Sequence, residues 1–429
     1  MFLTQADRSK KGDTLNTLIE LYDTVPIENV LAAEMFRPQE LILICPPEIE
    51  QDRQYRRSLR AYFEYRDVKL KLTFIPVSML DAMKIERVLR EVLDTHLDCA
   101  IDISGGTDAA LFAAGAVSGE NAVFTYSSKR NAFFEIKNAP FARSVRCDVR
   151  LDARSCFLMA GGTLLPGRLD NEDLEFRVDQ IERLFDIYSK YRRIWNRQIS
   201  YIQKISSAEP GKLDAEGRWT EKAGDRQVKA DAGLFKALAK AELILDLHMD
   251  DEGMRFRFPD ETVRFWLRDI GSVLELQVFR ACLEAGCFDD VVLSAVVNWQ
   301  GGAVKRDSVT NEIDVMAVQG IQPVFIRCKT CEIHTEALNE LAILRDRFGG
   351  KDSRAIIATS GVATKNRAPM RRRAAQLGIE VIEWDDLRFD RLVAKLKARP
   401  VRCGAAAAPS PPPGIKQMTW EIIYDHRRA

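Results

Sequence analysis

The sequence lacks net charge, long apolar runs and a secretory leader, and each absence excludes a class of protein. Its 63 basic residues are balanced by 63 acidic ones, so any surface that attracts nucleic acid must be a local patch. No run of about eighteen apolar residues occurs, so we expect no membrane-spanning helix and no membrane partner. The first residues do not follow the basic, apolar, small-residue order of a signal peptide, so we expect a cytoplasmic protein.

The nine cysteines are too scattered to form a disulfide framework. An odd number spread over a long chain is typical of free thiols in a reducing compartment. Cys328-x-x-Cys331 has the spacing of zinc or redox sites. Zinc needs four ligands, however, and Cys282 and Cys287 do not have the spacing of a second pair. Since Cys328 falls on the apolar face of a predicted strand, we expect a packed thiol there.

The composition is that of an ordinary folded protein. Hydrophobic residues make up 46% and charged residues 29% of the 429 residues, which excludes wholesale disorder. A chain of this length has room for about two or three domains. Changes of pattern along the chain predict four parts, at residues 1–150, 151–260, 261–400 and, as a Pro/Ala-rich tail, 401–429.

Residues 1–150 alternate apolar strands with amphipathic helices. Such alternation predicts an α/β sheet of the Rossmann type. The helices are expected over 83–94 and 109–116, and the strands over 41–45, 70–76, 99–103, 122–126 and 133–137.

A Ser104-Gly105-Gly106-Thr107 turn follows the third of these strands. Glycines let the backbone approach a ligand, while Ser104, Thr107 and the first amides of the next helix can hold phosphate oxygens. Open α/β sheets bind ligands at the carboxyl ends of such strands. A Gly-x-Gly-x-x-Gly motif and a Walker lysine are both absent, which disfavours a dinucleotide cofactor or an NTPase. The alternative is a plain strand-to-helix turn in which Thr107 or Asp108 caps the helix.

Residues 151–260 change character. One long helix is expected over 173–204, and a short helix over 233–244 precedes a hairpin of 245–249 and 254–259. The polar, turn-rich stretch 206–231 is predicted as a loop or linker. A helix followed by a hairpin is similar to a winged-helix module, which can contact nucleic acid but serves more often as a spacer or dimer strut.

The stretch 311–330 predicts a β-hairpin. Because strand side chains alternate between faces, Glu312 and Asp314 share one face of the first strand. Arg327 and Lys329 likewise share a face of the second strand. An acid and a lysine gathered by a hairpin suit metal-dependent phosphodiester cleavage, in which the carboxylate holds a divalent cation and the lysine aligns water or stabilises phosphoryl charge. The alternative is a solvated, charge-paired sheet face.

Elements predicted between residues 261 and 400 follow the α-β-β-β-α-β order of the restriction-endonuclease core. In that core one acid comes from the first helix, one from the second strand, and an acid-x-lysine pair from the third. Around the hairpin, the expected elements are helix 263–286, strand 291–297, helix 332–348, strand 355–359, basic helix 364–377, strand 380–384 and helix 389–398.

With these segments in order, the chain resembles the CARF-domain nucleases that are ancillary effectors of type III CRISPR immunity. The resemblance reaches to about residue 400 and rests on the order and spacing of segments 14–21, 25–31, 38–44, 102–107, 271–275, 311–314, 328–330 and 338–350. It implies an α/β fold with a Rossmann-like CARF sensor, a helical and winged-helix-like middle, and a PD-(D/E)XK nuclease domain of the restriction-endonuclease type.

The resemblance also implies a function. A homodimer of CARF domains would bind a cyclic oligoadenylate, with cyclic tetra-adenylate as the expected activator. Binding would reposition the nuclease domains, which would cut DNA or RNA with Mn²⁺ or Mg²⁺. By analogy, Glu275 and Asp314 are metal ligands and Lys329 is the catalytic lysine. The residues expected to cradle the ligand phosphates are Ser104, Gly105, Gly106 and Thr107.

One position departs from the family pattern, because Arg327 stands where the acid of the acid-x-lysine motif belongs and arginine cannot hold a metal. Glu312 can supply the missing oxygen, or Glu332 or Glu336 can reach back from the next helix. Alternatively, Arg327 contacts the scissile phosphate beside a single, weakly held metal. In a third interpretation the nuclease is degenerate and the protein is a ligand-sensing regulator. A constitutive DNA-processing enzyme would instead cut without any ligand.

Two further charged features lie in this part of the chain. Of the four histidines, His334 alone falls near the proposed nuclease site, and we favour a helix-surface role over proton transfer. The Arg371-Arg372-Arg373 cluster is either a solvated helix face or a surface that attracts a phosphate backbone.

Overall fold

The computed structural model describes residues 15–165, 174, 176–224, 226–303, 306, 308–350, 353–361 and 367–398. The tail predicted for 401–429 lies outside these residues. Within them, no helix has both the length and the apolar character needed to cross a membrane.

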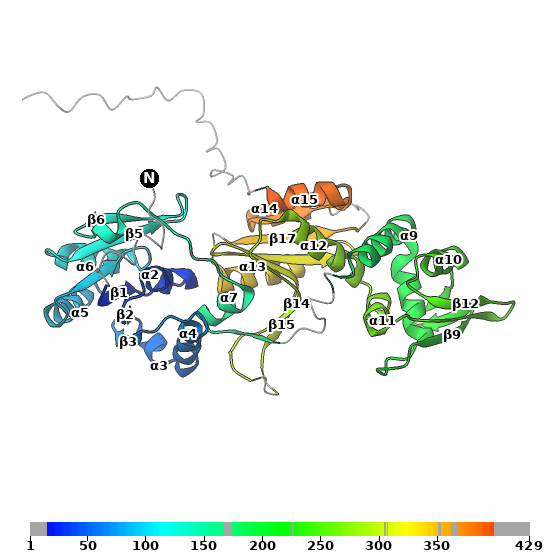
Figure 1. Cartoon of the computed structure of the whole chain (residues 1–429), viewed down its shortest axis with the longest axis horizontal. Helices are drawn as coiled ribbons and strands as arrows, with labels where there is room; N and C mark the ends of the chain where they lie inside the picture. The colour runs from blue at the N-terminus through cyan, green and yellow to red at the C-terminus, as the bar shows by residue number, and fades with distance from the viewer. Residues whose placement is uncertain are drawn as a thin grey trace, which may run out of the picture. The chain divides into compact units, whose positions relative to one another are not determined.

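Seven strands of the N-terminal part form one sheet in the order β3-β2-β1-β4-β5-β6-β7 (Figure 1). The pairs from β3 to β5 are parallel, and β6 and β7 add antiparallel strands at one edge. The strands are β1 (Thr17–Leu21), β2 (Glu40–Cys45), β3 (Lys71–Pro76), β4 (Cys99–Asp102), β5 (Ala122–Ser127), β6 (Ala132–Lys137) and β7 (Val145–Arg146).

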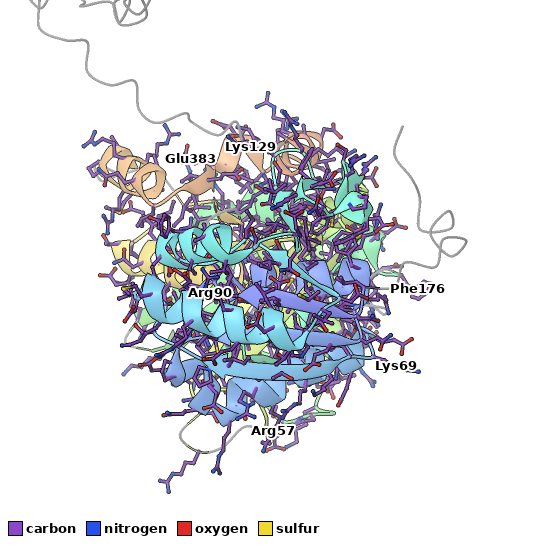
Figure 2. All side chains as sticks on the ribbon, turned by 90° about the vertical axis from the view of Figure 1, so that its left-hand side faces the viewer. Arg57, Lys69, Arg90, Lys129, Phe176 and Glu383 are labelled. Atoms are coloured by element: carbon purple, nitrogen blue, oxygen red, sulfur yellow. The ribbon has the colours of Figure 1, made fainter. Side chains whose placement is uncertain are left out.

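Helices cover both faces of this sheet, which explains why its strands are almost continuously apolar. Leu18 and Leu41 pack with the core that holds α4 (Arg53–Tyr65). The next residue of each strand, Ile19 or Ile42, packs with the core that holds α5 (Ala82–Thr95) and α6 (Asp108–Val117). Charged side chains such as Arg57 project outward (Figure 2). The helices are η1 (Pro26–Asn29), α2 (Leu31–Phe36), α3 (Pro47–Gln51), α4 (Arg53–Tyr65), α5 (Ala82–Thr95), α6 (Asp108–Val117) and the short η2 (Pro140–Ala142).

The middle part is built around the long helix α9 (Val178–Ile205). The prediction of a loop or linker over 206–231 is wrong. This stretch contains β9 (Asp214–Arg218), β10 (Thr220–Ala223) and β11 (Arg226–Lys229). These strands are short and mostly exposed, and only a few of their residues, such as Ala215 and Val228, are buried. With so few apolar residues, the sequence does not show the alternating pattern of a strand.

Strand β9 completes a three-stranded antiparallel sheet with β12 (Leu245–Met249) and β13 (Gly253–Arg257), the hairpin that the sequence predicts. The accompanying helices are α10 (Ala232–Lys240) and α11 (Glu261–Arg268). Upstream of α9, helix α7 (Ala153–Met159) leads to β8 (Thr163–Leu165), which pairs with a strand of the C-terminal sheet.

The C-terminal sheet has six described strands in the order β18-β17-β16-β15-β14-β8. The predicted hairpin is confirmed, since β15 and β16 pair antiparallel with Gln319 opposite Gln322. Cys328 is buried with a free thiol, as expected. The remaining elements are β14 (Asp290–Asn298), β15 (Thr310–Gln319), β16 (Gln322–Lys329), α13 (Thr335–Phe348), β17 (Arg354–Thr359), α14 (Arg367–Gln376), β18 (Ile379–Ile382), η3 (Trp384–Asp386) and α15 (Phe389–Lys397).

The single helix predicted over 263–286 is two helices, α11 and α12 (Ser272–Ala285). Asp269 is extended, and its Oδ1 accepts a hydrogen bond of 2.9 Å from the amide of Gly271. Because apolar residues continue on both sides of the break, the sequence pattern shows no gap. The break matters for function, since it places Glu275 in the first turn of a new helix.

Candidate functional site

Two regions bring together the residues predicted to act. The first lies where the order of the N-terminal sheet reverses, between β1 and β4. Glu20 and Asp102 are register partners at the carboxyl ends of these two strands. The loops that follow the two strands therefore meet at a topological switch point, where open α/β sheets bind ligands.

Hydrogen bonds to Asp102 and Tyr126 hold the Ser104 turn in place. Asp102 accepts the backbone amide of Ser104 at 2.7 Å and also the Ser104 hydroxyl. The same hydroxyl oxygen accepts the amide of Tyr126 at 2.7 Å. The one hydroxyl proton of Ser104 is thus directed at Asp102 and not at a ligand.

Thr107 caps helix α6, which is the alternative stated for this turn. Its Oγ1 accepts the amide of Ala110 at 3.3 Å and donates to the carbonyl of Met79. The amides of Gly105 and Thr107 form no hydrogen bond with the described residues. An anion at this turn would therefore be held mainly by backbone N–H groups at the start of α6.

The two glycines let the turn approach the loop after β1. A Cβ on Gly105 would lie 2.9 Å from the Cβ atoms of both Asp23 and Glu28. Gly106 has φ +109°, its Cβ would lie 2.9 Å from that of Leu21, and its amide donates to Asp23 at 2.9 Å. Gly105 therefore requires glycine for close contact, and Gly106 requires it for both contact and conformation.

The floor of the turn is acidic but buried. Burial raises the pKa of Asp102 to about 7, against the opposing hydrogen bonds from Ser104. Burial, followed by the charge of Asp102, raises the pKa of Glu20 well above its ordinary value. Carboxyl groups with raised pKa values carry less negative charge near neutral pH, which makes this floor less repulsive to an anionic ligand.

We expect Asp102→Asn to flatten the pH dependence of folding stability. The folded-state pKa of about 7 exceeds the ordinary 3.8, so the folded state keeps the proton up to a higher pH than the unfolded state does. Folding stability therefore falls as pH rises between these two values. The shift corresponds to roughly 4 kcal/mol above pH 7. Thermal melts at pH 4.5 and pH 8 should show a gain in Tm for the variant mainly at pH 8. An equal gain at both pH values would contradict this account.

The second region is the hairpin of β15 and β16. Backbone pairing of the two strands runs from Gln319 back to Val315 and stops there. At the next residue, Asp314 Oδ2 accepts the amide of Cys328 at 2.6 Å, so the carboxylate bridges the opened ladder. Opposite on β14, Ser294 has φ +51°. These local irregularities aim the Asp314 carboxylate between the strands, with 13% of its side chain exposed.

Glu275, at the start of α12, shares the electrostatic environment of Asp314. Burial raises the pKa of Glu275 to about 9, and the charges of Asp314, Asp269 and Glu312 add to the rise while Lys329 opposes it. Burial also raises the pKa of Asp314, against Arg327 and the Cys328 amide. The structure thus gathers Glu275, Asp314 and Lys329, with the exposed Glu312 at the rim.

Asp269 is the residue at this site that the sequence analysis missed. A Cβ on Gly271 would lie 2.6 Å from Glu275 Oε1 and 3.5 Å from Asp269 Oδ1, so the two carboxylates face each other across this glycine. The signal that could have found it is the Asp269-Ile270-Gly271 sequence, because an aspartate that accepts the amide two residues on forms a turn that competes with the helix.

Arg327, at the position of the motif acid, holds the hairpin to the next helix. Its Nη1 donates to the carbonyl of Glu312 at 2.6 Å and its Nη2 to Glu340 of α13 at 3.3 Å. Its distance to Asp314 Oδ1 is 3.9 Å. Glu332 and Glu336 are not among the main charges that act on Glu275 or Asp314. Of the acids proposed to replace the motif acid, Glu312 is therefore the one that contributes to this site.

The donor set fits Mg²⁺ or Mn²⁺, although no group of three or more His, Cys, Asp or Glu side chains in the described residues is arranged to hold a metal ion. Magnesium is commonly bound through one or two carboxylates, with water and substrate phosphates as its other ligands. The mutual repulsion of Glu275 and Asp314 is what a divalent cation would relieve.

Comparison with known proteins identifies the fold. No family model and no curated protein matches the chain. Protein VC1899 from Vibrio cholerae aligns with a TM-score of 0.67 and 16% identity over 90% of this chain and 98% of its own. Can2 from Sulfobacillus thermosulfidooxidans, solved in complex with cyclic tetra-adenylate, aligns with a TM-score of 0.64 and 17% identity over 90% and 98%.

The chain has the fold of Can2 and VC1899. The predicted α/β fold class is confirmed, with a largely parallel, Rossmann-like N-terminal sheet and a mixed C-terminal sheet. At these identities the likeness extends to the fold alone.

We expect Gly271→Ala to disturb the arrangement of Glu275 and Asp314 without unfolding the protein. Gly271 has an ordinary helical conformation, with φ −80° and ψ −33°, so alanine adds no backbone strain. Its methyl group would displace the Glu275 carboxylate, whose Oε1 lies 2.6 Å from the position of that Cβ. Cleavage should fall at least about tenfold while Tm changes little. Gly115→Ala, in open space on α6, is the control, and equal activity of the two variants would contradict the prediction.

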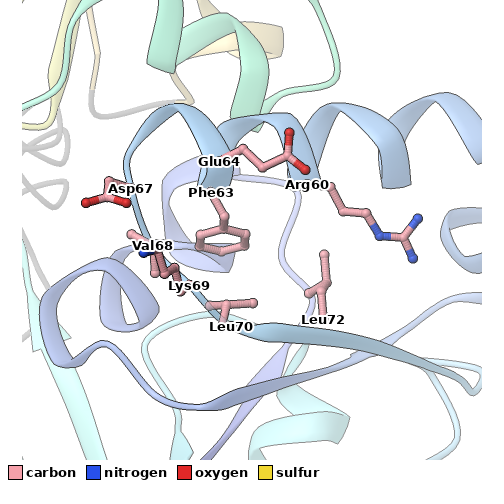
Figure 3. A pocket seen from close by; sticks show the side chains of 8 residues that line it. All are labelled: Arg60, Phe63, Glu64, Asp67, Val68, Lys69, Leu70 and Leu72. Atoms are coloured by element: carbon pink, nitrogen blue, oxygen red, sulfur yellow. The ribbon is translucent and has the colours of Figure 1, made fainter.

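A hollow lies between α4 and β3 (Figure 3). Its lining includes Phe63, Leu70 and Leu72, with Arg60 and Glu64 at the edge. None of its lining residues belongs to either region described above.

Proposed function

We propose that this protein is a metal-dependent nuclease that a cyclic oligoadenylate switches on, with cyclic tetra-adenylate as the first activator to test. The observation that carries the proposal is the presence, in one chain, of two features. One is a glycine turn at a sheet switch point, and the other is a site where Glu275 of α12 lies near Asp314 and Lys329 of the hairpin. The fold shared with Can2, a protein solved with cyclic tetra-adenylate, supports membership of the CARF nucleases of type III CRISPR defence.

In this proposal the ligand phosphates lie against the amides of Gly105 and Thr107 at the start of α6. Because burial raises the pKa of Asp102 and of Glu20, the floor beneath the phosphates is less negative than two fully ionised carboxylates would make it. A cyclic ligand repeats the same phosphate group on opposite sides of its ring. Two copies of one turn, related by a twofold axis, could bind it symmetrically, which favours a homodimer.

At the nuclease site, Glu275 and Asp314 would hold the metal, with Glu312 close by. A bound Mg²⁺ or Mn²⁺ supplies Lewis acidity and a nucleophilic water at neutral pH. Within the described residues, the Lys329 ammonium forms no ion pair, so it is available to align that water or to stabilise charge on the phosphoryl oxygens. Arg327, engaged with Glu340 and the hairpin backbone, would keep Asp314 in place.

The arginine favours one other candidate function, a ligand-sensing regulator without nuclease activity. Arg327 occupies the place of a metal-binding acid, and the described residues hold no ready three-ligand group. Such a protein would bind the cyclic nucleotide and act through a partner or DNA.

Two measurements on the full-length protein test the proposal. Calorimetric titration with cyclic tetra-adenylate should show binding at one ligand per two chains. Incubation with DNA and RNA in Mn²⁺ should then show cleavage that depends on the ligand. Binding without cleavage supports the regulator, and absence of binding defeats both.

A further inference from the structure

Helix α9 carries a stripe of basic side chains on its exposed face. Lys190, Arg193, Arg197 and Lys204 are all exposed, and their spacings place them on one face of an α-helix. None of them pairs with a carboxylate among the described residues; Lys190 only approaches the ring of Tyr191, at 5.4 Å. We refer to these four residues as the α9 stripe.

A neighbouring face of α9 contacts the strand end that bears Lys329. The hydroxyl of Tyr188 bonds that of Ser360, whose amide donates to the Lys329 carbonyl at 3.0 Å. Asn196 donates to the hydroxyl of Thr330 at 3.4 Å. Helix α9 therefore lies beside the strand end that bears Lys329.

The α9 stripe lies beside this contact face on the helical wheel. Arg192, one turn from both Tyr188 and Asn196, stacks over the ring of Trp384 at 3.9 Å and marks the middle of the contact face. The stripe is displaced from it by roughly a third of a turn, given 3.6 residues per turn. A strand that reaches Lys329 from this side would pass along the stripe.

We propose that the α9 stripe binds the phosphate backbone of the nucleic-acid strand that the nuclease site cuts. This inference rests on the proposed function and names a substrate-binding surface for it. From Lys190 to Lys204 the helix rises about 21 Å, which is enough to follow several phosphates at ~3.4 Å spacing. A chain without net charge must attract a polyanion through such a local surface.

The basic cluster that the sequence analysis singled out is a weaker candidate. Arg371 is held in an ion pair with Glu383, and Arg373 bonds the side chain of Asn339 at 3.4 Å. These side chains are already committed to neighbours, whereas the α9 stripe has no carboxylate partner among the described residues.

The test compares two triple charge reversals in the full-length protein. One is Lys190→Glu, Arg193→Glu and Arg197→Glu on α9. The control reverses three exposed arginines of α4, where Arg57 projects in Figure 2, with spacings of the same kind. The control substitutions are Arg53→Glu, Arg57→Glu and Arg60→Glu. A third variant, Lys190→Arg with Arg193→Lys and Arg197→Lys, keeps the charge and should keep the affinity.

Binding is measured with a labelled single-stranded DNA or RNA of 30 nucleotides in the Asp314→Asn background, so that the probe stays intact. Fluorescence anisotropy over a salt series, with and without cyclic tetra-adenylate, gives the affinity and its salt dependence. The α9 reversal should weaken binding at least about tenfold and reduce the salt slope by about 2, at ~0.7 per phosphate contact. The α4 reversal should change neither.

The inference is overturned if the two reversals weaken binding equally, or if the α9 reversal leaves binding unchanged. In cleavage assays without the Asp314 substitution, the α9 reversal should raise KM and leave kcat within about twofold. If the wild type cuts and the α9 reversal variant has the same KM as the wild type, this inference fails while the proposed function stands. A wild type that binds the probe and cuts nothing defeats the proposed function and, with it, the strand as a substrate.

Discussion

Asp314→Asn is expected to lower ligand-dependent cleavage at least about 100-fold, with little change in folding. Asparagine can still accept the hydrogen bond of 2.6 Å from the Cys328 amide, so the hairpin keeps its geometry. The variant loses the negative charge that would hold the metal. Alanine is the poorer choice, since it would leave a buried amide unpaired at a cost of about 1–3 kcal/mol.

Lys329→Ala should cause a loss of cleavage of similar size through the missing ammonium, and thermal melts check that both variants fold.

Glu312→Gln separates the interpretations of Arg327. A large loss in this variant would assign Glu312 the role of the missing motif acid, and a small loss would leave Glu275 and Asp314 as the only ligands. Full activity of Asp314→Asn would contradict the assignment of the site.

Gly105→Ala is expected to abolish the response to the ligand. The new Cβ would lie 2.9 Å from the Cβ atoms of both Asp23 and Glu28, which cannot swing away as the ends of long side chains can. The turn would have to shift, and with it the amides proposed to hold phosphate. We expect calorimetry to show a loss of affinity for cyclic tetra-adenylate of at least about 100-fold.

Gly115→Ala, on the helix that follows the same turn, is the matched control. A Cβ at this position has nothing within 4 Å, so alanine should leave ligand affinity unchanged and favour the helix by about 0.5–1 kcal/mol. If Gly105→Ala binds the ligand as tightly as Gly115→Ala does, the turn is not the ligand site.

Patterns set by burial were predictable from the sequence. Strands such as 41–45 are apolar on both faces because helices cover both. The start of β15 alternates because Glu312 is exposed there while Ile313 is buried, whereas Val315 to Val318 are buried on both faces. These long-range rules fixed the element order on which the candidate residues Asp314 and Lys329 depend.

Features that depend on tertiary contacts were not predictable. The polar strands β9 to β11 bury too few residues to show a period. The break at Asp269 lies between two helices rich in apolar residues, so no gap in the pattern marks the place where Asp269 and Glu275 face each other. Likewise, no local pattern pairs Arg327 with Glu340 or directs the hydroxyl proton of Thr107 to the carbonyl of Met79.

The most direct test of the account is cleavage by the wild type with and without cyclic tetra-adenylate. Single-stranded DNA, supercoiled DNA and RNA would each be incubated with the protein in Mn²⁺, beside the Asp314→Asn variant. We predict that the wild type cleaves at least one substrate only when the ligand is present, and that the Asp314→Asn variant cleaves no substrate. Equal cleavage without the ligand, or ligand binding with no cleavage of any substrate, would contradict it.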